Sequence, residues 1–428
     1  MGDLIGNSAI FLVGLIPLML LVISKVRRRS LKKINTIRYL TIALLLFLLT
    51  GCWSSHEIEE LGLTFAMGID KGKETELEKK FDEMGGNYPK KDRITMIYQY
   101  VNEQAAGSKS TGGSTDQKSY INVYGTGDSL QQINSEVALR QDRPVFSPHL
   151  KVIVIAAELL RTYSLAELLD QPLRDNEIRP SSMVIVTRGR ARDTLELKET
   201  GEMPAFRLRK IVENEYKAKK ILPPVTLAKL TGKMRSGTSY LLQNVIGTDG
   251  EVKYAGAAAI NGKTNKLIGY LDEHDLEGVM WITGMGIGGT VKSYDPEEKK
   301  VTAFGVETIK SDIKPIVKGN RLSFEVNVKS DGYLAENWST NEKAFDNKFL
   351  EKVEKTTEKT VKKTMEDITK KMKTEYKADL AGFGNELRIK HPRLWEKLKK
   401  NWDETFTDIP ITFHVQITIK EYGTVGDQ

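Results

Sequence analysis

Residues 411–420 read ITFHVQITIK and alternate apolar and polar side chains without interruption. Successive side chains of a strand point to opposite faces, so this period of two predicts one apolar and one solvated face. Residues 322–329 (LSFEVNVK) repeat the pattern. Strands with a single wet face are typical of antiparallel sheets. The two stretches therefore predict an antiparallel sheet near the C-terminus, covered on one face.

A long amphipathic helix is predicted between these strands. Its apolar side chains recur every three or four residues, opposite a side of mostly Lys and Glu; they are Phe345, Phe349, Val353, Val361, Met365, Ile368, Met372 and Tyr376. Residues 382–384 (GFG) end the helix, and a shorter helix is predicted at 392–401. The apolar stripe fits either the neighbouring sheet or a coiled coil with another chain, and the apolar strand faces favour the sheet.

The rest of the chain mixes strands and helices. In residues 52–200, strands are predicted at 61–69, 93–101, 120–124, 150–156 and 182–187, with helices at 130–137 and 158–169 and a mobile Gly/Ser-rich loop at 103–117. In residues 201–298, helices are predicted at 205–220 and 275–282 and strands at 240–246, 252–260 and 265–271. The fold class is therefore α+β: three mixed α/β domains at 52–200, 201–298 and 299–428, the last an antiparallel sheet covered by a long helix.

Cys52 is the single cysteine of the 428 residues and follows an export signal. Basic residues, an apolar run at 39–49 and small residues before the cut predict a signal peptide at 31–51. A cysteine directly after it predicts a lipoprotein, cleaved between Gly51 and Cys52 and carrying a diacylglyceryl group, with acyl chains such as palmitate, on the Cys52 sulfur. Two acyl chains suffice for stable membrane anchoring. The alternative is a membrane-spanning anchor, which needs ~20 apolar residues where the run has 11.

Residues 1–30 contain a second apolar run, at 9–23, followed by three arginines. A lipoprotein needs one export segment, so two interpretations stay open: an extra span, or upstream coding sequence joined to the frame. Residues 1–51 also carry six of the seven net positive charges. The body that follows is nearly neutral, and no nucleic-acid partner is expected.

No stretch predicts a catalytic, metal or cofactor site, so we expect no enzymatic activity. Residues 284–289 (GMGIGG) match a dinucleotide-binding pattern, but a β-branched, proline-broken stretch follows where that site needs a helix. A glycine-rich turn between strands is favoured. Residues 272–275 (DEHD) are interpreted as a solvated turn rather than a cation site, and His149 as a structural hydrogen-bonding group.

Arg174, Asp175, Glu177 and Arg179 form a mixed-charge cluster after a predicted helix. A local salt-bridged turn is the favoured interpretation. The alternative is a contact surface for a partner protein.

Several stretches resemble the Ger(x)C family, the C-subunit lipoproteins of spore germinant receptors. They are Cys52-Trp53 with 61–70 (LGLTFAMGID), 147–155 (SPHLKVIVI), 168–170 (LLD) with 174–179 (RDNEIR), and 382–384 with Pro392, Trp395, Trp402 and Phe406. The resemblance covers 49–428 in order and does not extend to residues 1–30.

The resemblance implies three sheet-and-helix domains on the outer face of the spore inner membrane, with no enzymatic activity. It implies two partners, an A-type subunit and a permease-like B-type subunit, which respond to nutrients together with this one. We therefore expect a non-catalytic, lipid-anchored receptor subunit needed for the germination response. The alternative is a ligand-capturing lipoprotein that binds a small nutrient.

Overall fold

The computed structural model describes residues 60–421, apart from 87, 92, 103–104, 106–116, 200, 218–219, 287, 296–298, 320 and 339–345. The predictions for residues 1–30, the signal at 31–51, Gly51 and Cys52 lie outside the described residues, as does most of the loop at 103–117. Within the described ranges, no helix combines the length and the apolar character needed to cross a membrane.

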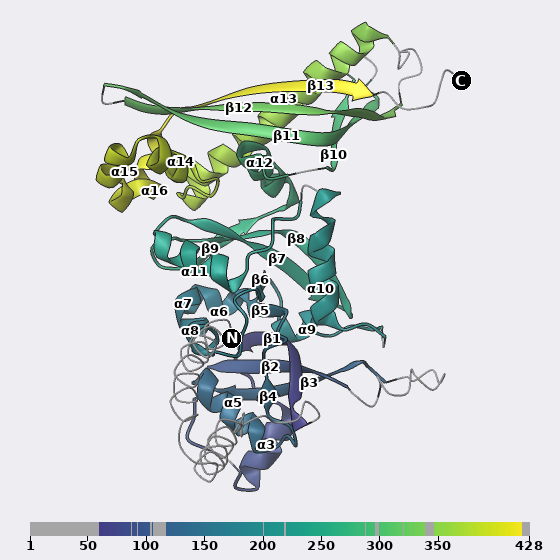
Figure 1. Ribbon diagram of the computed structural model, residues 1–428, viewed down its shortest axis with the longest axis vertical. Coiled ribbons are helices and arrows are strands. Elements are labelled where there is room, and N and C mark those ends of the chain that lie inside the picture. Colours follow the sequence, from purple (N-terminus) through teal and green to yellow (C-terminus); the bar gives the residue numbers. More distant parts are fainter. Residues whose placement is uncertain are drawn as a thin grey trace, which may run out of the picture. The chain divides into compact units, whose positions relative to one another are not determined.

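A nine-stranded sheet forms the first part of the described chain (Figure 1). The strands are β1 (Gly62–Lys71), β2 (Ile94–Val101), β3 (Tyr120–Gly127), β4 (Val145–Phe146), β5 (Val152–Ala156), β6 (Met183–Thr187), β7 (Tyr240–Thr248), β8 (Glu251–Ile260) and β9 (Leu267–Leu271). Their order is β3-β2-β1-β5-β6-β7-β8-β9, with β4 beside β1. The neighbours β1, β5, β6 and β7 are parallel, and antiparallel strands flank them on both sides.

Helices cover both faces of this sheet, which is why β5 and β6 are buried along their whole length. One face packs against α5 (Leu130–Ala138), α6 (Ala157–Thr162), α7 (Leu165–Leu168) and α11 (Leu227–Ser236). The other packs against α9 (Ala191–Thr194) and α10 (Pro204–Val212). The remaining elements of this part are α3 (Glu76–Glu83), α8 (Asp170–Arg174) and the 3-10 turn Glu213–Tyr216.

Two local helix predictions have different outcomes. Ser129 caps α5 by accepting a hydrogen bond from the Gln132 N–H, as expected, and Leu130, Ile133 and Val137 are its buried face. The single helix predicted at 158–169 is two helices, because Ser164 starts α7 with a reciprocal hydrogen-bonded cap to Glu167.

The large sheet continues across the predicted domain boundary at residue 200. Val186 of β6 pairs with Asn244 of β7, and Thr187 pairs with Val245. Residues from the first two predicted domains therefore share one sheet, and the boundaries of the three domains stay a prediction.

A second sheet of four strands, in the order β10-β11-β12-β13, forms the C-terminal part. They are β10 (Thr290–Tyr294), β11 (Val301–Lys318), β12 (Arg321–Asn337) and β13 (Ile411–Glu421). The mixed α+β class is confirmed, but the sheet is not wholly antiparallel: β13 runs parallel to β12. The chain crosses between these two strands through a series of helices, which is the long connection that parallel neighbours need.

Strand β11 is the longest strand and had no counterpart in the sequence prediction. Its pairing with β12 shifts register between Ala303 and Phe304 and again between Val306 and Thr308. Such irregularities interrupt the period of two that identifies a strand in the sequence.

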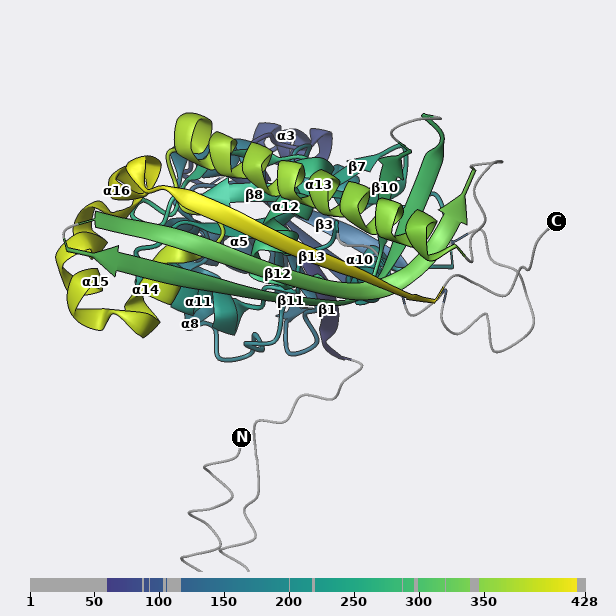
Figure 2. The same ribbon diagram turned by 90° about the horizontal axis from the view of Figure 1, so that it is seen from above.

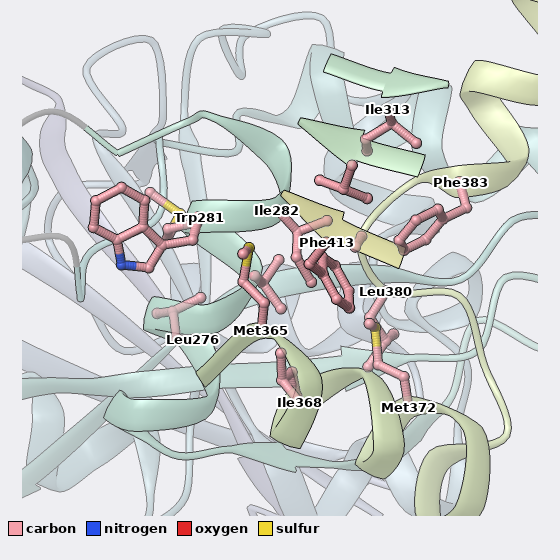
Figure 3. Packing of buried hydrophobic residues seen from close by; sticks show 14 of the residues in the cluster. Leu276, Trp281, Ile282, Ile313, Met365, Ile368, Met372, Leu380, Phe383 and Phe413 are labelled. Atoms are coloured by element: carbon pink, nitrogen blue, oxygen red, sulfur yellow. The ribbon is translucent and has the colours of Figure 1, made fainter. Parts of the chain in front are cut away.

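The helices of this part are α12 (Glu273–Thr283), α13 (Asn347–Lys371), α14 (Phe383–Lys390), α15 (Pro392–Leu398) and α16 (Trp402–Asp408), with a π-helical turn at Met372–Tyr376 and a 3-10 turn at Lys399–Asn401. Figure 2 shows α13 running beside β13. Its apolar stripe packs inside the chain, against α12 and the sheet; Figure 3 shows Leu276, Trp281, Met365, Ile368 and Phe413 in this core. The long helix is thus confirmed as a covering element.

The end of the long helix differs from the prediction. The chain leaves the helical conformation at Lys377, whose φ of 47° is left-handed. Residues 382–384 do not stop α13. Instead Gly382, with φ 83°, precedes α14, which begins at Phe383.

Candidate functional site

A cavity of about 1180 Å³ lies at the carboxyl ends of β1, β5 and β6. Asp70 and Lys71 at the end of β1, Ala156 at the end of β5 and Arg188 just after β6 line it. The chain leaves β1 toward β2 and leaves β5 toward β6, in opposite directions along the sheet. In open α/β sheets, ligands bind outside the carboxyl ends of the strands where the connections diverge in this way. This cavity is the candidate functional site.

Asp70 fixes the segment that follows β6. Its side chain is 6% exposed and accepts hydrogen bonds from the Ala191 N–H at 2.5 Å and the Arg192 N–H at 3.0 Å. Burial raises the pKa of Asp70 above its usual value of 3.8, and the two hydrogen bonds oppose that rise. The carboxylate joins the end of β1 to the start of α9, so it positions the wall of the cavity.

The other carboxylates that line the cavity are paired with basic side chains. Glu158 contacts Lys71 at 2.5 Å, and Asp193 contacts Arg190 at 3.1 Å. The two remaining pairs are Glu74 with Lys90 at 2.7 Å and Glu76 with Lys79 at 2.8 Å. Their negative charges are balanced within the protein.

Three cations at the cavity lack such a partner. Within the described part of the chain, Lys73, Arg188 and Arg192 have no carboxylate within ion-pair distance. The guanidinium of Arg188 stacks on the ring of Tyr270 at 4.2 Å, and that of Arg192 on Tyr124 at 4.8 Å. Burial raises the pKa of both tyrosines above 10.0, so their uncharged hydroxyls do not neutralise the arginines at neutral pH. The site therefore has an excess of positive charge.

One wall of the cavity is apolar and open. Leu77 and Phe81 of α3 and Ile121 of β3 line it with side chains that are 55%, 41% and 49% exposed. Large apolar side chains that stay exposed together are a common feature of binding surfaces. The wall offers contact area to an uncharged portion of a ligand.

The mixed-charge cluster predicted from the sequence lies at α8 and the turn after it, and none of its members lines the cavity. Arg174 pairs with Asp170 at 2.9 Å, and Asp175 accepts a hydrogen bond from the Glu177 N–H at 2.9 Å. Arg179 is exposed. The ion pair lies within α8 and the hydrogen bond within the turn, so these contacts are local, and a partner contact through these residues stays a prediction.

The segment at 272–275 is not a solvated turn. Asp272 caps α12 by accepting a hydrogen bond from the Asp275 N–H, and the Asp275 carboxylate accepts one from the Asp272 N–H. Asp275 is 4% exposed and contacts Lys371 of α13 at 2.6 Å. The prediction was wrong because the partner of Asp275 lies far along the chain. Its carboxylate joins two helices of the C-terminal core.

The glycine-rich stretch at 284–289 joins a helix to a strand. Gly284 ends α12 in a left-handed conformation, and β10 starts at Thr290. The interpretation as a turn therefore fits, although a helix and not a strand precedes it. His149 packs near the ring of Phe65, with 6.0 Å between the ring centroids.

The sequence analysis missed the cavity, although one signal was present. Arg188, Arg190 and Arg192 follow the buried strand at 182–187 at every second position. Charged residues placed directly after a parallel strand lie at the carboxyl edge of its sheet, where ligands bind.

Comparison with known proteins identifies relatives over most of the chain. The family model described as "Spore germination protein N-terminal domain" matches residues 54–245 and includes every residue that lines the cavity. The model described as "Spore germination B3/ GerAC like, C-terminal" matches residues 255–423.

Individual proteins give the same picture. Spore germination protein YndF of Bacillus subtilis (strain 168) is 55% identical over 391 residues, which are 90% of this chain and 96% of YndF. Spore germination protein B3 of the same organism is 28% identical over 385 residues, 89% of this chain and 96% of that protein. A solved structure titled "Crystal Structure of the GerBC protein" is 25% identical, with a TM-score of 0.56, and covers 84% of this chain and 99% of its own.

Proposed function

Since the chain belongs to the Ger(x)C family of spore germination proteins, we propose that it is a non-catalytic, lipid-anchored subunit of a nutrient germinant receptor. The 55% identity to a spore germination protein over nearly the whole chain is the observation that carries the proposal. The relatives named B3, A3 and KC support a place in a receptor assembly. The proposed partners are an A-type subunit and a permease-like B-type subunit.

The proposed anchor is a diacylglyceryl group on Cys52, with residues 31–51 as its signal peptide and Gly51 at the cleavage point. It would hold the body on the outer face of the spore inner membrane. Arg174, Asp175, Glu177 and Arg179 are candidate partner contacts, since they are charged and lie at the surface around α8. The status of residues 1–30 stays as two interpretations.

A Cys52→Ala variant tests the anchor and the receptor role together. In spores with no redundant receptor, we expect the variant to lose the mass of the lipid, to leave the membrane fraction and to lower nutrient germination by at least tenfold. Cys52→Ser is a second variant that also lacks the thiol and should behave alike. Normal nutrient germination in a strain without the gene would contradict the receptor role, whereas normal germination with Cys52→Ala alone would contradict only the need for an anchor.

The cavity favours a second candidate function, capture of a small nutrient by this subunit itself. Its volume of about 1180 Å³ lies just above the range of small-molecule sites, roughly 300–1,000 Å³. Calorimetry of the purified chain with nutrient germinants separates the two functions. Binding by this subunit alone favours capture, and binding only in the presence of the partners favours the scaffolding role.

A further inference from the structure

The side chains that line the cavity carry more positive than negative charge. All five lining carboxylates have partners: Asp70 binds two backbone N–H groups, and Glu74, Glu76, Glu158 and Asp193 each bind a basic side chain. Lys73, Arg188 and Arg192 have no counter-ion among the described residues. All three side chains are exposed and line the same cavity, so an anion in it would meet positive charge that no carboxylate of the described residues offsets.

We propose that the cavity at the carboxyl ends of β1, β5 and β6 binds a small organic anion, whose carboxylate or phosphate group is held by Arg188, Arg192 and Lys73. Both chemistries offer oxygen pairs that match the planar fork of arginine. The ligand class follows from the sign of the unpaired charge and is independent of the proposed role in germination.

The two arginines are pre-organised for this task. Each guanidinium lies over a tyrosine ring, which restrains the side chain. Tyr270 comes from β9 and Tyr124 from β3, so elements from both sides of the parallel strands hold the pair. A restrained side chain loses less entropy when it binds, which raises affinity.

The backbone that carries the arginines is also fixed. Asp70 accepts the N–H groups of Ala191 and Arg192, and the hydroxyl of Thr194 lies 2.9 Å from that of Thr187. The segment between β6 and α9 is therefore tied to β1 and to the end of β6. The exposed wall of Leu77, Phe81 and Ile121 would contact the uncharged part of the anion.

Titration calorimetry of the purified full chain in detergent tests the proposal with defined probes. Citrate supplies carboxylates, inorganic phosphate and glucose 6-phosphate supply phosphate, and glucose is the uncharged control. We expect at least one anionic probe to bind with a Kd below about 1 mM, with several-fold weaker binding when salt rises from about 50 to 300 mM. The probe that binds identifies which oxygen chemistry the site prefers.

Matched variants test whether Arg188 and Arg192 themselves bind the anion, or whether the positive charge of the protein as a whole attracts it. Arg188→Gln/Arg192→Gln should weaken the bound anion by at least about tenfold, because two charge-assisted contacts are lost. Lys399→Gln/Glu396→Gln removes an exposed ion pair that does not line the cavity and should stay within about threefold of the parent chain. Lys73→Gln, a single exposed change, gives an independent measurement and should weaken binding about threefold.

Three outcomes would overturn the proposal: no anionic probe bound at 10 mM, glucose bound as tightly as glucose 6-phosphate, or full affinity in both Arg188→Gln/Arg192→Gln and Lys73→Gln. Failure of the receptor role would appear in spore germination instead. The binding measurement on the purified chain is unaffected by that result.

Discussion

The two sheets differ in whether the polar groups at their borders are paired within the protein. At the free edge of β13, Glu358 of α13 accepts the Ile417 N–H at 3.1 Å and Glu354 accepts the Ile419 N–H at 2.7 Å. At the carboxyl ends of β1, β5 and β6, three cations have no carboxylate partner in the described chain. The N–H groups of the first site are paired within the protein, whereas the cations of the second are available to an anionic ligand.

The closure of β13 follows from the geometry of a helix beside a strand. Four residues of helix rise about 6.0 Å, and two residues of strand rise about 6.6 Å. Carboxylates four apart on α13 therefore meet N–H groups two apart on β13. An edge occupied in this way cannot add another strand, which protects the sheet from edge-to-edge association. We infer that a charged group paired with another group of the protein has a structural role. A charged group without an oppositely charged partner is available to bind a ligand.

The largest effect is expected at Asp379, the most completely paired carboxylate. It is 2% exposed and accepts hydrogen bonds from the N–H groups of Ala381, Gly382, Phe383 and Gly384 and from the Trp402 indole. Asp379→Asn places an NH₂ group against these donors and should lower the free energy of unfolding by about 3–5 kcal/mol.

Urea unfolding followed by tryptophan fluorescence measures this loss. Glu404→Gln, an exposed change in α16, the helix that carries Trp402, is the control and should stay within ~0.5 kcal/mol. A loss below about 1 kcal/mol for Asp379→Asn would contradict the view that full internal pairing marks a structural role.

A smaller effect is expected at the edge of β13. Glu354→Ala/Glu358→Ala leaves two strand N–H groups without acceptors, which should cost about 1–3 kcal/mol together. The freed edge should also promote self-association. Unfolding and sedimentation velocity measure the two results. The control Lys355→Ala/Lys359→Ala alters exposed positions on the same helix and should change neither the unfolding free energy nor the self-association. If both variants self-associate, the glutamates do not prevent association at the edge of β13.

The sequence predicts those features that rest on local periodicity. Strands 150–156 and 182–187, the Ser129 cap and the length of α13 follow from neighbouring residues alone. The direction of β13 does not, because alternation is the same in parallel and antiparallel strands. The cavity also depends on distant partners: Asp70 meets Ala191, 121 residues away, and Lys71 meets Glu158, 87 residues away. Which charges remain unpaired is therefore settled only by the fold.

The smallest effect is expected at Glu273, which is paired but lies near the surface. Its carboxylate contacts Lys253 at 2.5 Å and Lys220 at 3.2 Å, and the hydrogen bond with Lys253 lowers the pKa of Glu273 below its usual 4.5. A carboxyl with a lowered pKa in the folded state stabilises it above the unfolded pKa, and this contribution disappears as pH falls through the folded value. Glu273→Gln should therefore cost at most about 1 kcal/mol at pH 7 and nothing well below pH 4. The measurement is the difference in unfolding free energy between the two chains from pH 7 to pH 3. A difference in unfolding free energy that persists near pH 3 would mean that Glu273 stabilises the fold through packing. Ion pairing would then not distinguish structural charges from ligand-binding charges at partly exposed sites.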